Sequence, residues 1–401
     1  MSERRIPLSE PRMSGNEARY LAECVETNWV SSAGPFVERF EREVARATGV
    51  PHAVACVNGT AALHVALLVA GVEPDDEVLV SDLTFIASAN AIRYCRAWPV
   101  LIDAEARYWQ IDPDKVRDFL ARECRWRKRR LVNRRTGRRI RAIMPAHILG
   151  HPADMAPILE AARRFELPVV ADAAEALGAL YRGEPVARIA DVAALSFNGN
   201  KIVTAGGGGA VLTGTAQLAE RARYLTNQAK DDPVESLHGE VGFNYRLTNL
   251  QSAVGLAQLE RLDRCLESKR ATAAYYARAL GGLPLELPEE AVWARSSWWL
   301  YTVLIEEEKF GVDRASVMRA LAARGIETRP LWMPVSGQRP FADCQAYRSE
   351  HALGLHRRSL SLPCSVGIAE DDLTRVASAL AETHAEFAGA GGSARVRRGS
   401  R

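Results

Sequence analysis

Paired cysteines are missing from this sequence. Its 401 residues include seven cysteines, an odd number, and no two of them form a Cys-x-x-Cys pair. Such a scattered set argues against a disulfide framework and against a cysteine-based zinc site, and it favours reduced thiols in a cytoplasmic protein. The seven are Cys24, Cys56, Cys95, Cys124, Cys265, Cys344 and Cys364.

Long apolar runs are also missing. The longest, residues 61–72, contains His64 and is too short to span a bilayer. No apolar run follows Arg4 and Arg5 near the amino terminus, as one would in a signal peptide. We therefore expect a protein that stays in the cytoplasm and does not insert into a membrane.

Charge of one sign is not in excess. The net charge is +3, with 25% charged and 47% hydrophobic residues, as in ordinary soluble proteins. This balance gives no reason to expect a nucleic-acid partner. A chain of 401 residues exceeds what one hydrophobic core normally spans, so two domains are expected.

What the sequence does contain is an alternation of short apolar strands and helical segments. Strands are predicted at residues 53–57, 77–80, 99–102, 142–145, 168–171, 192–197 and 209–213, and helices at 61–70, 85–94 and 154–165. Because the strands are almost continuously apolar, both faces of their sheet should be covered, as in parallel sheets. The predicted class is α/β with a parallel or mostly parallel central sheet.

The pattern changes near residue 250. A long helix is predicted at 249–279, followed by an apolar strand within 297–305 and a helix at 313–324. We interpret residues 1–261 as a large α/β domain and residues 262–387 as a smaller carboxy-terminal α+β domain. The tail, 388–401, is rich in Gly, Ala, Ser and Arg and is expected to be disordered.

Residues 122–141 interrupt the large domain with eleven Lys or Arg among twenty residues. The segment has two halves on either side of a turn at residues 133–137, and this pattern predicts an inserted β-hairpin. This insertion can be a solvated excursion, or it can attract the diphosphate of a substrate in a neighbouring subunit. Nucleic acid is the weakest of these alternatives, because the rest of the chain is balanced in charge.

The chemistry of the chain centres on Lys201 and Asp172. Lys201 follows the apolar strand 192–197 and precedes the run Gly206 to Gly209, while Asp172 ends another buried strand. Pyridoxal phosphate needs such a pair: the lysine forms a Schiff base, and the aspartate keeps the pyridine nitrogen protonated. Each residue also has a plain structural explanation, since Lys201 can be a solvated loop charge and Asp172 with Glu175 matches a helix capping box.

Other strand ends add candidates for the same site. Asn58-Gly59-Thr60 opens a helix after a strand, where backbone N–H groups and a hydroxyl can hold a phosphate. Ser196 can add a second hydroxyl, and Phe85 can stack on a flat ring. Taken singly, these residues also fit a tight turn with a helix cap and ordinary core packing.

Together these residues resemble the sugar aminotransferases of the DegT/StrS family, which have the fold-type I architecture of aspartate aminotransferase. The resemblance covers most of the chain and is carried by residues 31–41, 58–63, 83–90, 172–175, 196–201 and 242–247. It implies pyridoxal 5′-phosphate as cofactor, glutamate and a nucleotide sugar as substrates, a homodimer with shared active sites, and no metal.

The resemblance also assigns roles by position. It implies that Lys201 is the catalytic lysine, that Asp172 holds the pyridine nitrogen, that Phe85 stacks on the ring, and that Glu175 faces the cofactor 3-hydroxyl or the substrate. The phosphate cup would be Gly59, Thr60 and Ser196, completed by Asn244 of the other subunit. The implied substrate contacts are Trp29, Ser31, Ser32, His147 and Trp332.

The glycine run after Lys201 and the basic insertion depart from the common family pattern. With the sequence Phe197-Asn198-Gly199-Asn200-Lys201, they resemble a branch that aminates UDP-linked 4-keto-6-deoxy-N-acetylhexosamines. We therefore predict amino transfer from glutamate to C4 of UDP-2-acetamido-2,6-dideoxy-4-hexulose. The alternatives are a GDP- or dTDP-linked 4-keto-6-deoxyhexose of the perosamine type and, in another class, a non-enzymatic cofactor-binding regulator.

Overall fold

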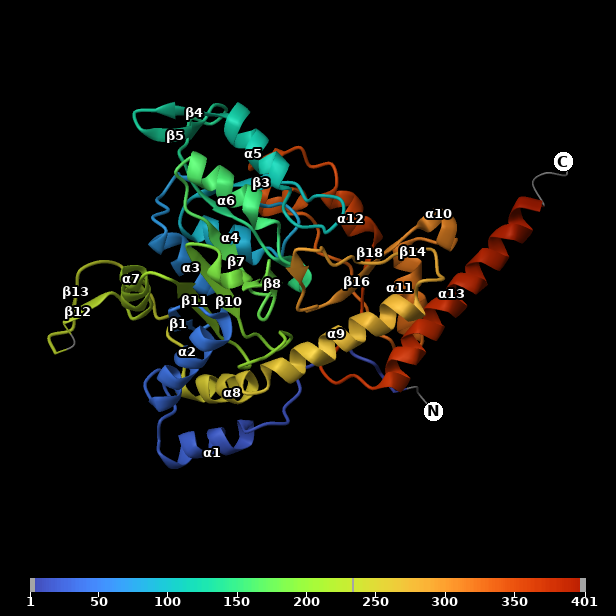
Figure 1. Cartoon of the computed structure of the whole chain (residues 1–401), viewed down its shortest axis with the longest axis horizontal. Coiled ribbons are helices and arrows are strands. Elements are labelled where there is room, and N and C mark those ends of the chain that lie inside the picture. The colour runs from blue at the N-terminus through green and yellow to red at the C-terminus, as the bar shows by residue number, and fades with distance from the viewer. Residues whose placement is uncertain (1–3, 233, 397–401) are drawn as a thin grey trace.

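A computed structural model describes residues 4–232 and 234–396, with the backbone alone for 389–396. The large α/β body carries a long helix, α9, toward a smaller lobe in which α13 runs along the edge (Figure 1). Among the described residues, no helix is both long and apolar enough to cross a bilayer.

The central sheet has the strand order β1-β11-β10-β7-β6-β2-β3-β17. Parallel bridges from Ile143 to Val169 and from Ala146 to Asp172 join its two halves. β11 runs antiparallel to both of its neighbours and every other pairing is parallel, which confirms the mostly parallel sheet. The strands are β1 (His52–Cys56), β2 (Glu77–Ser81), β3 (Trp98–Ile102), β6 (Ile140–Met144), β7 (Val170–Asp172), β10 (Val192–Ser196), β11 (Gly209–Thr213) and β17 (Gln345–Tyr347).

Helices cover both faces of this sheet, because its strands are apolar on both sides. In β2, Val78 and Val80 face a core with α3 and α4, whereas Leu79 faces a core with α2, α5 and α6. These elements are α2 (Pro35–Thr48), α3 (Gly59–Val69), α4 (Ala87–Tyr94), α5 (Pro113–Arg122), α6 (Met155–Arg164) and α7 (Ala216–Thr226). This two-sided covering leaves the strand ends as the place for a site.

The predicted helix 249–279 is wrong as a single element. It divides into α8 (Asn249–Leu259) and α9 (Leu262–Ala279), with Arg261 outside helical geometry at φ −116° and ψ 9°. At the break, the Glu260 carboxylate accepts hydrogen bonds from Asn16 and Tyr20. Asn16 directly precedes α1 (Glu17–Glu26), and Tyr20 lies within it. Contacts made by residues distant in sequence therefore set the break.

The carboxy-terminal part is α+β, as predicted. Its sheet has the order β14-β16-β18, with α11 against β18 and α12 against β16, while α13 packs against α9, α10 and α11. The elements are β14 (Leu285–Glu286), β15 (Ala294–Arg295), β16 (Tyr301–Ile305), α10 (Glu307–Phe310), α11 (Arg314–Ala323), α12 (Ala352–Arg358), β18 (Ser359–Leu362) and α13 (Glu370–Val396). Short strands β8 (Leu180–Tyr181), β9 (Glu184–Pro185), β12 (Lys230–Asp232) and β13 (Leu237–His238) edge the large body.

The disorder expected for residues 388–401 is wrong over most of that range. The α13 backbone stays helical to Val396, and residues 397–401 lie outside the described residues. A helix that has already nucleated extends at low cost, which composition alone does not reveal.

The basic insertion forms the predicted hairpin, from β4 (Cys124–Arg127) and β5 (Arg130–Asn133). Its turn is at Lys128 and Arg129, both at positive φ (48° and 61°), and not at residues 133–137 as predicted. Residues 133–137 instead form a second turn into β6, closed by a hydrogen bond from Gly137 N–H to the Asn133 carbonyl.

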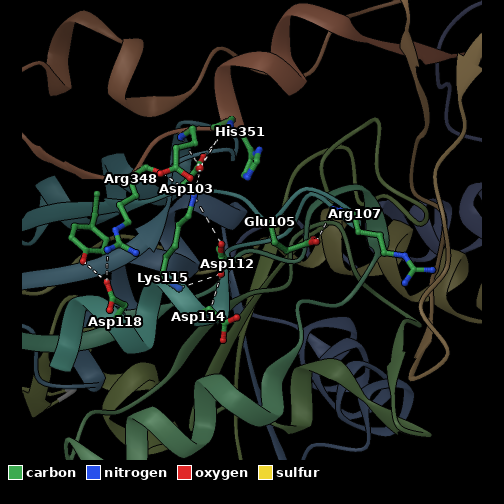
Figure 2. Close-up of polar contacts among 12 residues, drawn as sticks. Asp103, Glu105, Arg107, Asp112, Asp114, Lys115, Asp118, Arg348 and His351 are labelled. Atoms are coloured by element: carbon green, nitrogen blue, oxygen red, sulfur yellow. Dashed lines mark hydrogen bonds and ion pairs between the residues drawn. The ribbon is translucent and has the colours of Figure 1, made fainter. Parts of the chain in front are cut away.

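A segment of the carboxy-terminal part returns to the large sheet. β17 pairs with β3, and the segment that follows β17 contacts Asp103, the residue directly after β3 (Figure 2). The Asp103 carboxylate accepts hydrogen bonds from Lys115 Nζ at 2.7 Å and from the N–H groups of Glu350, His351 and Ala352. We propose that the domain boundary lies between residues 261 and 262. β17 follows this boundary in the sequence but forms an edge strand of the large domain's sheet.

Candidate active site

A cavity of about 380 Å³ opens at the carboxyl ends of the central strands. The turns after β1, β2, β6, β7 and β10 line it on one side, and residues 299–300 and 329–332 line it on the other. Ligands of open α/β sheets bind at this edge. Nine predicted site residues line the cavity: Gly59, Thr60, Phe85, His147, Asp172, Glu175, Ser196, Lys201 and Trp332.

Lys201 lies in the cavity wall, on the turn that follows β10. Its Nζ atom is 3.5 Å from Glu175 Oε1 and 4.0 Å from the centroid of the Trp299 ring. The side chain is 13% exposed. The amine is thus held by a carboxylate and an indole face, in reach of a molecule in the cavity and shielded from bulk water.

Asp172, the last residue of β7, is buried beside Lys201. One carboxylate oxygen accepts a hydrogen bond from Ser88 Oγ at 2.5 Å, and the other accepts one from Ala174 N–H at 3.0 Å. Burial raises the pKa of this carboxyl, and the Ser88 hydrogen bond opposes that rise. No helix begins after Asp172, so the capping-box alternative is wrong. A buried carboxylate with neutral donors alone is suited to a cationic ring N–H, which fits pyridoxal phosphate.

Glu175 connects Lys201 to the loop after β6. Its Oε2 atom accepts a hydrogen bond from Leu149 N–H at 2.9 Å, and Oε1 faces Lys201. Burial raises its pKa to about 7, although the nearby Lys201 acts in the opposite direction. Near neutral pH, this carboxyl can therefore both accept and donate a hydrogen bond at the cavity wall.

The start of α3 has the geometry of a phosphate site. The Asn58 side chain accepts a hydrogen bond from Ala61 N–H at 2.8 Å, while the first-turn N–H of Thr60 has no partner within the helix. A Cβ atom on Gly59 would lie 2.7 Å from Ser196 Cβ. Glycine thus lets the Ser196 hydroxyl reach the positive end of the helix, and this cradle fits a phosphate.

Two aromatic residues lie across the cavity. Phe85 is 52% exposed although it is large and apolar. Its ring meets Trp332 edge-on, with centroids 6.3 Å apart and planes inclined by 61°. Phe85 is therefore accessible from the cavity, and its stacking on a flat ring stays a prediction.

His147 supplies an unpartnered polar atom. Its Nδ1 atom accepts a hydrogen bond from Ala153 N–H at 3.0 Å, which places the proton of the neutral ring on Nε2. Nε2 is buried without a hydrogen-bond partner among the described residues. Burial, and secondarily His151, lowers the His147 pKa to about 3. A neutral N–H donor of this kind fits an acceptor on a molecule bound in the cavity.

Four predicted residues do not line the cavity. Trp29 and Ser31 belong to an exposed loop whose carbonyls accept hydrogen bonds from buried Asn249. Ser32 is on the same loop, and Asn244 is exposed ahead of α8. Within one chain, the structure does not bring these residues to Lys201.

The structure also adds residues that the sequence did not single out. Ser88 binds the Asp172 carboxylate, Asn58 caps α3, and Trp299 contacts Lys201 while its Nε1–H donates to the Asn200 carbonyl at 2.8 Å. Arg329 lines the cavity near Trp332. Asn58 had a local signal, an N-cap residue directly before a helix. Trp299 had none, because it comes from another part of the chain.

The fold and the site define a pyridoxal-phosphate-dependent aminotransferase. The sequence profile of the DegT/DnrJ/EryC1/StrS aminotransferase family matches residues 11–381, and the chain belongs to this family. A GDP-perosamine synthase of Caulobacter vibrioides is 42% identical, over 94% of this chain and 97% of that protein. A GDP-perosamine synthase of Vibrio cholerae is 33% identical, over 94% and 98%. The crystal structure of S. venezuelae DesV matches with a TM-score of 0.82 at 33% identity, over 92% and 94%.

Proposed function

We propose that the protein transfers an amino group from glutamate to C4 of a GDP-linked 4-keto-6-deoxyhexose. The observation that carries this proposal is the cavity in which Lys201 faces Glu175 and Asp172, in a chain 42% identical to a GDP-perosamine synthase. The relatives favour this perosamine-type alternative over the predicted UDP-linked N-acetyl sugar. The seven cysteines, all free thiols, support action in the cytoplasm.

Each residue has a defined task in this reaction. Pyridoxal phosphate, when bound, withdraws electrons and carries the amino group between the two substrates. With the cofactor bound, Asp172 would keep the proton on the ring nitrogen, and Thr60 and Ser196 would hold the phosphate. Lys201 Nζ removes a proton from the α-carbon of glutamate and, in the second half, delivers a proton at C4 of the sugar.

The proposed enzyme is a homodimer. The exposed positions of Asn244, Trp29, Ser31 and Ser32 support a role at the active site of a second copy, where they would meet the cofactor phosphate and the nucleotide sugar. An isologous pairing gives two equivalent sites per dimer.

A substrate panel tests the proposal. Glutamate is supplied with GDP-, UDP- or dTDP-linked 4-keto-6-deoxy sugars, and the products are identified by mass spectrometry. Amination of the GDP-linked sugar at the highest kcat/KM is expected. A preference for the UDP-linked N-acetyl sugar would restore the earlier prediction. Failure to form 2-oxoglutarate with any sugar would favour the non-enzymatic regulator.

A further inference from the structure

Four consecutive basic residues form the tip of the inserted hairpin. Arg127, Lys128, Arg129 and Arg130 are all exposed, and none of them has an ion pair within the described part of the chain. The hairpin extends past α5 at the upper left of Figure 1. By contrast, Arg122, Arg138 and Arg139, nearer its base, each face a carboxylate.

The geometry of the tip is unfavourable for stability alone. Arg127 and Arg130 are directly opposite each other across the two strands, and such like-charge pairs destabilise a hairpin. Arg125 shares their face. Lys128 and Arg129 both adopt left-handed backbone conformations, which this two-residue turn normally assigns to Asn and Gly. Edge protection explains charged side chains along the strands, but it does not require four adjacent basic residues at the turn, and these indicate an anionic partner.

The tip is carried on a fixed base. Asn133 Nδ2 donates hydrogen bonds to Glu77 Oε2 at 2.8 Å and to Gln345 Oε1 at 2.7 Å, and Thr136 donates to Glu77 Oε1. Glu77 begins β2, whereas the cavity is at the other end of that strand. The tip therefore projects from the end of the sheet opposite its own active site.

The remainder of the molecule has the opposite charge. Residues 122–141 hold eleven basic residues and one acidic residue, so the rest of this +3 chain is net negative. Net charge alone therefore does not draw the rest of the chain to a polyanion, and the hairpin concentrates eleven of its 52 basic residues in one short segment.

We propose that this tip docks the enzyme on a bilayer surface that carries anionic lipid. Trp126 is 48% exposed and is one cross-strand pair behind the tip, opposite Leu131. Tryptophan favours the headgroup level of a membrane, where the basic tip would meet lipid phosphates. A nucleic-acid site follows its strand along a groove, whereas this tip is convex, and laterally mobile lipids can gather around it.

Vesicle co-sedimentation of the full-length, cofactor-loaded protein tests the proposal. Phosphatidylcholine vesicles with phosphatidylglycerol should bind it in a salt-sensitive way, and pure phosphatidylcholine vesicles should not. Replacing Arg127, Lys128, Arg129 and Arg130 by Gln should weaken binding at least about tenfold. Trp126→Ser should weaken binding without changing its salt dependence.

The matched control removes four exposed arginines elsewhere, Arg163, Arg164, Arg264 and Arg278, by substitution with Gln. It should bind vesicles as the unaltered protein does, and both quadruple variants should keep full aminotransferase activity. Equal loss in the control, tighter binding to a single-stranded oligonucleotide, or release by inorganic phosphate would overturn the proposal. A raised KM for the sugar nucleotide in the tip variant would also overturn it, by assigning the tip to substrate binding.

Discussion

At the scale of residues, the site depends on groups that are buried and incompletely paired. Among the described residues, Asp172 accepts hydrogen bonds from neutral donors alone and His147 Nε2 has no partner, while burial raises the pKa of Glu175 to about 7. Burying such groups costs free energy. Asp172 is suited to a cationic ring, and His147 is suited to a hydrogen-bond acceptor on a bound molecule.

Replacing Lys201 by Ala is expected to separate binding from catalysis. Turnover should fall by about 10³-fold or more, because the group that moves the proton is lost. Cofactor should still bind, because Thr60, Ser196 and Asp172 remain. Stopped-flow turnover and equilibrium dialysis measure the two effects, with Lys230→Ala as the control. Near-normal turnover in Lys201→Ala would refute the assignment.

Replacing Glu175 by Gln is expected to change how stability depends on pH. Burial raises the Glu175 pKa from 4.5 to about 7, so the folded state binds more protons than the unfolded state between these values. The free energy of unfolding therefore falls as pH rises through this window. Cofactor-free Glu175→Gln should be the more stable protein above pH 7, by at most about 3 kcal/mol.

Urea unfolding of both cofactor-free proteins across the window checks this sign. Below pH 4.5 the two free energies of unfolding should converge, because Glu175 is then protonated in both states. A constant difference at every pH would show that the Glu175 proton is not involved.

At the scale of elements, much of the arrangement could be predicted from sequence. Buried parallel strands put their carboxyl ends at one edge, so Lys201, Asp172 and Ser196 could be placed together from their position after strands. The break between α8 and α9 and the return of β17 could not, because each is set by partners distant in sequence. Ser88 and Trp299 were missed for the same reason.

The close approach of α3 and β10 predicts the effect of a single methyl group. Gly59→Ala would put Cβ 2.7 Å from Ser196 Cβ, so it should lower the unfolding free energy by about 1–3 kcal/mol and weaken cofactor binding. Gly214→Ala is the matched control, since nothing lies within 4 Å of its Cβ. Equal denaturation midpoints and cofactor affinities in the two variants would contradict the packing argument.

At the scale of the whole molecule, the proposed homodimer would bring Asn244 of one copy to the Lys201 cavity of the other copy. Mixing Lys201→Ala subunits with Asn244→Ala subunits should restore activity, because in a two-fold dimer one site receives both defects and the other receives neither. Activity is measured after subunit exchange has been verified with differently tagged chains. No recovery would show that Asn244 does not act in a second copy.

The central claim is that the Lys201 cavity moves an amino group from glutamate to a GDP-linked sugar. The direct measurement is mass spectrometry of the sugar product after reaction with glutamate labelled in its amino nitrogen. We expect the label at C4 of the GDP-linked 4-keto-6-deoxyhexose with the unaltered enzyme, and its loss in Lys201→Ala. Unlabelled product, or equal labelling by the Lys201→Ala variant, would contradict the account.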